Sequence, residues 1–265
     1  MGIDGFLKAV VDLKKMEVKQ AAAGLSLSRI RKEAEALPSA ADFRTALEKS
    51  SRKRPGIIAE IKKASPSRGD IRPDLDPAGF AAEYAKGGAC AVSVLTENKY
   101  FKGSLDDLEA VSGAVDLPVL RKDFTIAEYQ IYEARARGAS SILLICSILE
   151  KEQLADYIAL SRETGMEPLV EINSEYELET ADRCGAVLIG VNNRNLVTLE
   201  TDLDVTRRIA PLFGKNHIPV QASGIKTAGE IRQGVESNIF NFLIGESIVS
   251  SPDPEKFIKE LLSHD

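Results

Sequence analysis

Short apolar runs of this sequence end in four ionisable residues: Glu60, Lys62, Lys122 and Glu171. Burying an ion without a partner costs on the order of several kcal/mol, so such charges usually meet one another or a ligand. Two lysines and two glutamates that face one cavity shift each other's pKa values, so that one donates a proton and another accepts one near neutral pH. The pattern therefore predicts an active site that uses general acid–base chemistry.

From Gly56 onward the sequence repeats one unit, a short apolar run followed by a polar loop and a longer amphipathic segment. Short, continuous apolar runs are typical of parallel strands that are buried on both faces. The predicted strands cover residues 57–62, 91–96, 119–123, 141–146, 169–172, 187–192, 220–223 and 240–245. Apolar residues at helical spacing predict helices over residues 77–86, 105–114, 126–137, 150–164, 175–183, 202–210, 228–236 and 254–263.

Strands and helices that alternate eight times over about 200 residues predict an α/β fold, the (β/α)8 or TIM barrel. The alternative is an open doubly wound sheet, which would carry a glycine-rich fingerprint after its first strand. Residues 60–65 contain no glycine, so the sequence favours the barrel. Residues 1–55 lie outside the repeat, and we expect them to form a helical extension that packs on the barrel mouth or edge, within a single domain of residues 1–265.

The four charges fall at the carboxyl ends of the predicted strands, where the active site of a barrel lies. Residues two apart on a strand point to the same side, so if Ile58 faces the barrel interior, Glu60 and Lys62 face it too. Lys122 and Glu171 repeat this arrangement in the third and fifth strands. A structural ion pair would explain each position alone, whereas a shared cavity explains all four.

The last predicted strands end in small residues that expose backbone N–H groups before a helix start. The loops after the seventh and eighth strands of a barrel commonly hold phosphate, and helix dipoles favour the negative charge. The predicted phosphate cradle comprises Ser223, Gly224, Gly245 and Ser247. At the end of the sixth strand, Asn192 and Arg194 add an amide and a cation, or are a loop asparagine and a surface arginine.

Aromatic residues and a polar loop follow the first three strands. Residues 64–69 form a rather long loop, which suits a mobile segment that covers a substrate as well as a plain connector. Phe101 and Phe124 lie just beyond the second and third strands, where they could stack on an aromatic substrate or belong to the core.

The composition excludes several classes of function. The 265 residues are 28% charged with a formal net charge of -6, which argues against a nucleic-acid-binding surface. Three cysteines and two histidines match neither a metal-ligand pattern nor a disulfide framework, so we expect reduced thiols, no metal and no flavin. We expect no signal peptide, and the longest apolar stretch is too short to cross a membrane. We therefore expect a cytoplasmic protein.

The motifs around these residues resemble those of the indole-3-glycerol-phosphate synthase family, over nearly the whole chain. They are IAEIKKASPS, LTENKYFKGS, LPVLRKDF, MEPLVEIN, GVNNRNL and LIGESIV. The resemblance implies a lyase of tryptophan biosynthesis, which closes the indole ring of 1-(2-carboxyphenylamino)-1-deoxyribulose 5-phosphate with loss of carbon dioxide and water. It implies a phosphorylated small-molecule substrate, no cofactor, and scope for association with other tryptophan-pathway enzymes.

The resemblance also implies roles for individual residues. By the family's pattern Lys122 protonates the ketose carbonyl oxygen, and Glu171 is the base in the dehydration. Lys62 holds charged groups of the substrate or shares the acid role, while Glu60 and Asn192 orient hydroxyls and lysines. The matching phosphate positions are Arg194, Ser223, Gly224, Gly245 and Ser247; the matching apolar wall is Phe101, Phe124, Leu143 and Leu196; Ser65 is a further substrate-binding position.

One position departs from the family's pattern. The family usually reads Ser-Glu-Ser-Gly-Ile at the end of the seventh strand, whereas this chain has Ala222 in place of the glutamate. If that glutamate mainly balances a lysine, its loss alters lysine basicity and slows turnover. If that glutamate is essential, the chain is a weakened paralogue that binds a phosphorylated anthranilate. A separate alternative on the same scaffold is a phosphosugar aldolase or isomerase in which Lys122 forms a Schiff base.

Overall fold

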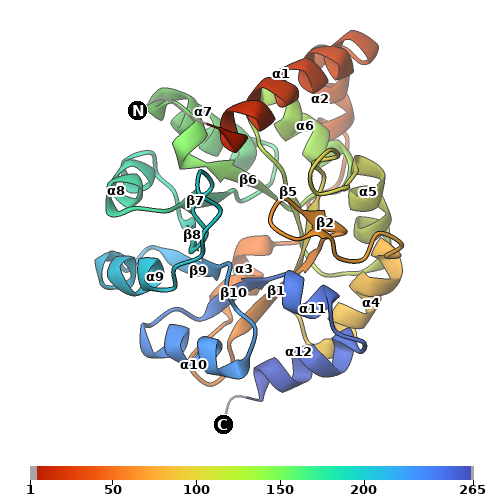
Figure 1. Ribbon diagram of the computed structural model, residues 1–265. Helices are drawn as coiled ribbons and strands as arrows, with labels where there is room; N and C mark the ends of the chain where they lie inside the picture. Colours follow the sequence, from red (N-terminus) through yellow and green to blue (C-terminus); the bar gives the residue numbers. More distant parts are fainter. Residues whose placement is uncertain (1–4, 264–265) are drawn as a thin grey trace.

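The computed structural model describes residues 5–263, and over this span eight parallel strands close into a barrel surrounded by helices (Figure 1). The barrel strands are β1 (Gly56–Ile61), β4 (Ala91–Leu95), β5 (Val119–Lys122), β6 (Ser141–Ile145), β7 (Leu169–Ile172), β8 (Leu188–Asn192), β9 (Ile218–Ala222) and β10 (Asn241–Ile244). Each strand pairs in parallel with the next, and β10 pairs with β1. The predicted (β/α)8 barrel is confirmed, and every predicted strand overlaps an observed one.

Helices follow the barrel strands and cover the outside of the sheet. They are α4 (Pro77–Gly87), α5 (Leu105–Ala114), α6 (Glu128–Ala136), α7 (Lys151–Glu163), α8 (Glu175–Arg183), α9 (Asp204–Ile209), α10 (Ala228–Glu236) and α12 (Pro254–Leu262). Hydroxyl side chains begin several of them, because Ser104, Ser174 and Thr227 each accept a hydrogen bond from a backbone N–H of the first turn. The predicted helices are confirmed.

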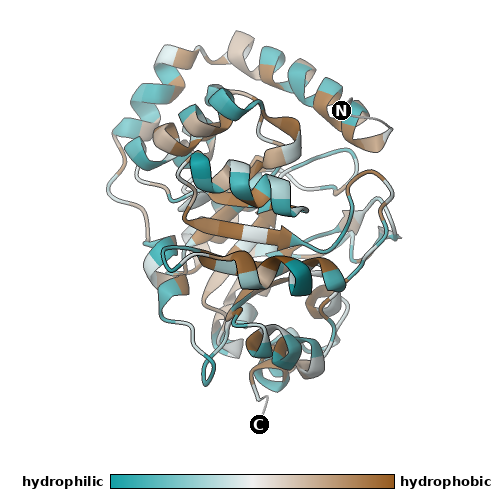
Figure 2. Ribbon diagram, turned by 90° about the vertical axis from the view of Figure 1, so that its left-hand side faces the viewer, coloured by the Kyte–Doolittle hydropathy of each residue, from teal (hydrophilic) through white to brown (hydrophobic). Residues whose placement is uncertain are grey.

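Apolar side chains pack on both sides of the closed sheet. On β1, Ile57, Ala59 and Ile61 pack in the core between strands and helices, whereas Ile58 packs in the core inside the barrel. This alternation confirms that Ile58 faces the interior, and it sends Glu60 to the same side. In Figure 2 the strands are coloured mostly hydrophobic, while the helices around them carry hydrophilic residues as well.

The extension that precedes the barrel has three helices over residues 5–55, which the structure describes. They are α1 (Phe6–Gly24), α2 (Leu27–Glu35) and α3 (Phe43–Glu48). On α1, Phe6 reaches the cavity at the carboxyl ends of the strands, and Ile30 of α2 packs in a cluster with Tyr129 and Tyr132 of α6. Phe6 of α1 thus lies at the barrel mouth, and α2 packs against α6 at the barrel edge.

The third helix of the extension lies at the opposite end of the barrel, which the sequence did not predict. Phe43 and Leu47 of α3 are buried in the interior core, and Asp42 caps the helix by accepting a hydrogen bond from Thr45. Ser50, just after α3, lies against Gly56, the first residue of β1. The extension therefore covers the mouth with α1 and closes the amino end with α3.

Short elements in the loops were not predicted. They are the antiparallel strands β2 (Ala64–Ser65) and β3 (Gly69–Asp70), the helix α11 (Glu246–Val249), and the 3-10 turns η1 (Cys146–Ile148) and η2 (Ala210–Leu212). Elements this short contain no full period of a hydrophobic pattern, so the sequence offers no signal for them. Within residues 5–263, no helix is long and apolar enough to cross a membrane.

Candidate active site

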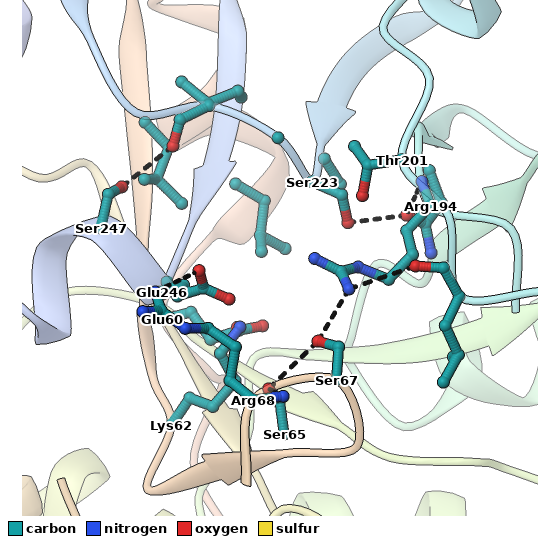
Figure 3. Close-up of a pocket in the computed structure, with 18 of the residues that line it drawn as sticks. Glu60, Lys62, Ser65, Ser67, Arg68, Arg194, Thr201, Ser223, Glu246 and Ser247 are labelled. Atoms are coloured by element: carbon teal, nitrogen blue, oxygen red, sulfur yellow. Dashed lines mark hydrogen bonds and ion pairs between the residues drawn. The ribbon is translucent and has the colours of Figure 1, made fainter. Parts of the chain in front are cut away.

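A cavity of about 640 Å³ opens at the carboxyl ends of the barrel strands. Residues predicted for catalysis line it together: Glu60, Lys62, Lys122, Glu171 and Asn192. So do most of the residues predicted for substrate binding: Ser65, Phe101, Phe124, Arg194, Leu196, Ser223, Gly224, Gly245 and Ser247. The polypeptide thus gathers side chains from distant parts of the sequence around one space, part of which is drawn in Figure 3.

The four strand-end charges form ion pairs inside this cavity, and we call them the pocket cluster. Lys62 Nζ lies 2.8 Å from Glu60 Oε1, and Lys122 Nζ lies 3.4 Å from Glu171 Oε2. The carboxylate side chains are only 4% and 6% exposed, whereas the lysine side chains are 15% and 18% exposed. Each buried carboxylate therefore has a cationic partner, and each lysine keeps access to the cavity.

Asn192 connects the pocket cluster to the predicted phosphate cradle. Its Nδ2 atom donates to Glu171 Oε1 at 2.9 Å, while its Oδ1 atom accepts from the Arg194 backbone N–H at 3.0 Å and from Ser223 Oγ at 2.8 Å. The two oxygens of Glu171 are thereby held by different groups, Asn192 on one side and Lys122 on the other. This leaves the carboxylate fixed in orientation beside the cavity.

The charge state of Lys122 follows from its neighbours. Burial lowers the pKa of Lys122, but the negative charges of Glu171 and Glu60 more than offset that effect, so the pKa is raised above that of an ordinary lysine. The side chain is therefore an ammonium group at neutral pH. It can donate hydrogen bonds and protons, but it offers little neutral amine for nucleophilic attack.

The predicted phosphate cradle lies at the carboxyl ends of β9 and β10, next to the end of β1. Ser223 and Gly224 follow β9 with φ values of 68° and 84°, a left-handed turn that directs successive backbone groups to one side. Gly245 precedes α11, and a Cβ atom there would lie 2.3 Å from Glu60 Oε1, so a larger residue would displace the Glu60 carboxylate from its present position. Arg194 Nη1 donates to Ser67 Oγ at 2.8 Å, which places its cation at the rim of the cradle.

An apolar wall faces the polar groups. Phe124, Phe101 and Leu196 line the cavity, and Phe6 of α1 joins them with its ring 6.4 Å from that of Phe124 in an edge-to-face arrangement. Leu143 lies deeper in the barrel than the pocket cluster. It pairs with Leu169 of β7, two residues before Glu171, whereas the residue of β6 that pairs with Glu171 is Ile145. The structure therefore places Leu143 in the interior core rather than on the cavity wall.

The loop that carries Phe101 is held by a buried acid. Glu97 is fully buried, and its carboxylate accepts backbone N–H hydrogen bonds from Lys99, Tyr100 and Phe101 at 2.7 to 3.0 Å. Gly103 completes the turn, because a Cβ atom there would overlap the carbonyl group of Leu95. Glu97 thus fixes the backbone from which Phe101 reaches the cavity.

A second group of charges lies on the other face of β5, and we call it the buried cluster: Lys14, Asp123, Arg121, Glu133 and the hydroxyl of Thr96. Asp123 accepts from Lys14 Nζ at 2.9 Å and from Thr96 Oγ1 at 2.7 Å, and Arg121 lies between Asp123 and Glu133. Burial raises the pKa of Asp123, but the charges of Lys14 and Arg121 outweigh burial and lower it. Burial lowers the pKa of Lys14, and the carboxylates of Asp123 and Glu17 reverse that effect and raise it.

Several residues that line the cavity were not predicted as binding residues, although three of them belong to the 64–69 loop that could cover a substrate. They are Phe6, Pro66, Ser67, Arg68, Leu95, Leu199, Thr201, Leu203, Ile225, Lys226, Glu230, Leu243, Ile244, Glu246 and Ser250. Most lie in loops beside a predicted position, so their neighbourhood was the only available signal. In the part of the chain that the structure describes, no cluster of His, Cys, Asp and Glu has the arrangement of a metal site.

Comparisons with known proteins agree with this geometry. The profile of the family described as "Indole-3-glycerol phosphate synthase" matches residues 7–261. A protein of that name from Desulfosudis oleivorans is 53% identical over 208 residues, which cover 78% of this chain and 79% of the relative. Another from Laribacter hongkongensis is 44% identical over 259 residues, which cover 97% and 98%. The solved 3-hexulose-6-phosphate synthase from Salmonella typhimurium shares the fold, with a TM-score of 0.64, 10% identity, and coverage of 79% of this chain and 97% of that chain.

Proposed function

Because the chain belongs to the indole-3-glycerol phosphate synthase family, we infer that it is a carboxy-lyase of tryptophan biosynthesis. It closes the indole ring of 1-(2-carboxyphenylamino)-1-deoxyribulose 5-phosphate and yields indole-3-glycerol phosphate, carbon dioxide and water. The main support for this proposal is that Lys122 and Glu171 form an ion pair in the same cavity that contains the predicted phosphate cradle around Ser223. An acid, a base and an anion site are the groups that this reaction requires.

We propose that Lys122 is the acid of the ring closure. The ring carbon that bears the carboxylate attacks the ketose carbonyl carbon, and the Lys122 ammonium group donates a proton to the carbonyl oxygen. The raised pKa of Lys122 supports this role because it keeps the proton on the nitrogen until the oxygen gains negative charge. The 3.4 Å separation from Glu171 is long for an ion-pair hydrogen bond, so Lys122 can turn toward a substrate at little cost.

Glu171 is the proposed base of the dehydration. After carbon dioxide leaves, the new hydroxyl accepts a proton from Lys62, which shares the acid role, and departs as water, while Glu171 takes the proton that the five-membered ring loses. The amide of Asn192 supports this role, since it holds one carboxylate oxygen and leaves the other beside Lys122. In the same proposal Lys62 binds a negatively charged group of the substrate, and Glu60 orients Lys62.

We assign each binding residue to the part of the substrate that we propose it contacts. Arg194, Ser223, Gly224, Gly245 and Ser247 bind the phosphate, while Phe101, Phe124 and Leu196 hold the aromatic ring and Ser65 contacts the substrate from the hairpin. Phe6 extends the aromatic wall from the helical extension.

The alternatives are less consistent with the site. A Schiff-base aldolase or isomerase needs a neutral amine, whereas the neighbouring carboxylates raise the pKa of Lys122. A paralogue that only binds would follow if the missing acid at Ala222 were essential. Lys122 already has Glu171 and Glu60 as negative neighbours, so we propose that the chain catalyses without a carboxylate at position 222.

The experiment adds the carboxyphenylamino deoxyribulose phosphate to the purified protein and follows the appearance of indole fluorescence. Turnover by the wild type, with a loss of about 10²- to 10⁴-fold in Glu171→Gln, would support the proposal. No fluorescence at high enzyme concentration would refute it. Borohydride added during turnover separates the Schiff-base alternative, because covalent trapping of substrate on Lys122 would favour that mechanism.

We also propose that the protein works in the cytoplasm. Its substrate class carries a charged phosphate ester, which stays in the compartment where it is made, and Cys90, Cys146 and Cys184 are free thiols as a reducing compartment favours. Association with other tryptophan-pathway enzymes stays a prediction. Co-purification of a tagged copy from cells grown without tryptophan would test both points.

A further inference from the structure

We propose that Arg68 is a specificity-determining residue, which lets the cavity accept a phosphorylated substrate by neutralising Glu246. This inference rests on the proposed function, because it concerns the phosphate cradle of the same cavity. Arg68 lies in the turn between β2 and β3, and Glu246 is the first residue of α11. Arg68 belongs to the 64–69 loop that could cover a substrate, and Glu246 stands between two predicted cradle residues; neither was itself predicted to bind, and both line the cavity.

The carboxylate of Glu246 lies beside the proposed phosphate site, where its negative charge is unfavourable. Glu246 stands between Gly245 and Ser247, which are proposed to bind a phosphate dianion, and its side chain is 23% exposed. A carboxylate beside a bound phosphate repels it, and the repulsion is stronger in a partly buried cavity than in water. A cradle with Glu246 alone would therefore disfavour the substrate it is expected to hold.

Arg68 supplies the missing positive charge. Its Nη1 atom lies 2.8 Å from Glu246 Oε1, and the two side chains come from segments 178 residues apart in the sequence. In Figure 3, Arg68 comes from the hairpin that carries Ser65 and Ser67, whereas Glu246 comes from α11 beside Ser247. The guanidinium group thus reaches the cradle from the hairpin that follows the neighbouring strand β1.

The charge balance at the cradle depends on this one side chain. With Arg68 in place, Arg194 is left as a net positive charge for the phosphate; without Arg68, the charges of Arg194 and Glu246 cancel. Two further pairs of opposite charge line the cavity, Lys62 with Glu60 beside Gly245 and Lys226 with Glu230, and each pair leaves this balance unchanged. Arg68 therefore decides whether the cradle presents a positive or a neutral field to an anion.

The hairpin also touches the other side of the cradle, because Ser67 Oγ accepts a hydrogen bond from Arg194 at 2.8 Å. The positive charge of Arg68 is therefore carried by the same hairpin that contacts Arg194 through Ser67. Simple tethering of the hairpin is the competing explanation for any effect of Arg68. A second ion pair separates the two, since Lys102 Nζ lies 2.6 Å from Asp70 Oδ1 on β3 and holds the same hairpin at a place outside the cavity lining.

The test measures KM and kcat for the carboxyphenylamino deoxyribulose phosphate in Arg68→Met, Glu246→Gln, the double variant, and Asp70→Asn as the tethering control. Inorganic phosphate serves as a competitive inhibitor that reports on the cradle alone. We expect Arg68→Met to raise KM and the inhibition constant of phosphate by about tenfold, with kcat changed less than about twofold. The double variant should return both constants to near the wild-type values, and Arg68→Lys should retain most of the affinity because it keeps the charge.

Equal increases in KM for Arg68→Met and Asp70→Asn would overturn the inference in favour of tethering. A double variant as weak as Arg68→Met would overturn it as well, because neutralisation of Glu246 would then be irrelevant. If the wild type forms no indole, the proposed function fails and this inference fails with it. If the wild type turns over and Arg68→Met leaves both constants unchanged, only this inference fails.

Discussion

The pocket cluster and the buried cluster lie on opposite faces of one strand, yet the same kinds of residue do different work in them. Along β5, Lys122 points into the cavity and Asp123 points the other way, toward α1. The Lys122 side chain is 18% exposed to the cavity, whereas the Lys14 side chain is 4% exposed and is surrounded by protein. A charged side chain that is partly exposed to the cavity can interact with a substrate. A charged side chain that is enclosed by protein instead joins the helices and strands that carry its partners.

The largest effect that would test this comparison is the loss of Lys122. Lys122→Met should lower kcat/KM by about 10³-fold, because it removes the proposed proton donor. Glu171 loses its cation but keeps Asn192 and borders the open cavity, so the free energy of unfolding should fall by no more than about 2 kcal/mol. Steady-state fluorescence kinetics and urea unfolding measure the two quantities. Lys256→Met is the matched control, since Lys256 is an exposed lysine on α12. Substantial activity in Lys122→Met would show that the pocket cluster is structural too.

The next effect concerns the buried cluster. Lys14→Met should lower the free energy of unfolding by about 3 kcal/mol, because Asp123 would keep a buried charge with one cation fewer. We expect kcat to change only a few-fold. Lys15→Met is the control from the same helix, since Lys15 forms an exposed ion pair with Asp12. A fall in kcat comparable to that of Lys122→Met, with stability unchanged, would erase the distinction between the clusters.

The pH dependence of stability sharpens the comparison further. The pKa of Asp123 is lowered in the folded protein, so its contribution to stability is complete above its unfolded value of about 3.9 and is lost as the pH falls through its folded pKa. The pKa of Lys14 is raised, so its contribution is complete below about pH 10.4 and is lost as the pH rises through its folded pKa.

Urea unfolding from pH 6 down to pH 2 checks the acid limb. The stability difference between the wild type and Asp123→Asn should shrink toward low pH, by no more than about 1.4 kcal/mol per pH unit. A difference that stays constant over this range would contradict the lowered pKa.

The pH dependence of activity tests the pocket cluster in the same way. Because the pKa of Lys122 is raised, the alkaline loss of kcat should begin above the ordinary lysine value of about 10.4.

The smallest expected effect lies at Ala222, which lines the cavity and is almost fully buried. Ala222→Glu should raise kcat by about two- to fivefold, because a third carboxylate would balance the lysines of the pocket cluster. Ala222→Gln is the control of equal size without the charge. An unchanged or lower kcat in Ala222→Glu would show that Glu60 and Glu171 already supply the negative charge that Lys122 needs.

The barrel and the pocket cluster could be predicted because both leave local signals. Short apolar runs mark strands, and a charge at the end of such a run is conspicuous, as at Glu60 and Lys122. The contacts could not be predicted in the same way. Asp123 also ends an apolar run, but its partner Lys14 lies 109 residues earlier, on a helix where a lysine carries no signal.

Other misses have the same physical origin. Arg68 and Glu246 belong to a loop and to a four-residue helix, so no period marks their elements. The depth of Leu143 depends on the stagger between β6 and β7, which is a property of the closed sheet and not of either strand. The sequence therefore indicates which residues reach the carboxyl ends of strands, while the fold decides which of them meet.

The long separation between Lys14 and Asp123 bears on how each new molecule is made. During synthesis α1 leaves the ribosome well before β5. Lys14 of this helix therefore has no Asp123 to pair with until another 109 residues have been synthesised. Contacts between segments so far apart form late, because the intervening chain has to be ordered first. The wall that carries Phe6 therefore takes its place only after the first three of the eight barrel strands have been synthesised, and until then the future cavity is uncovered.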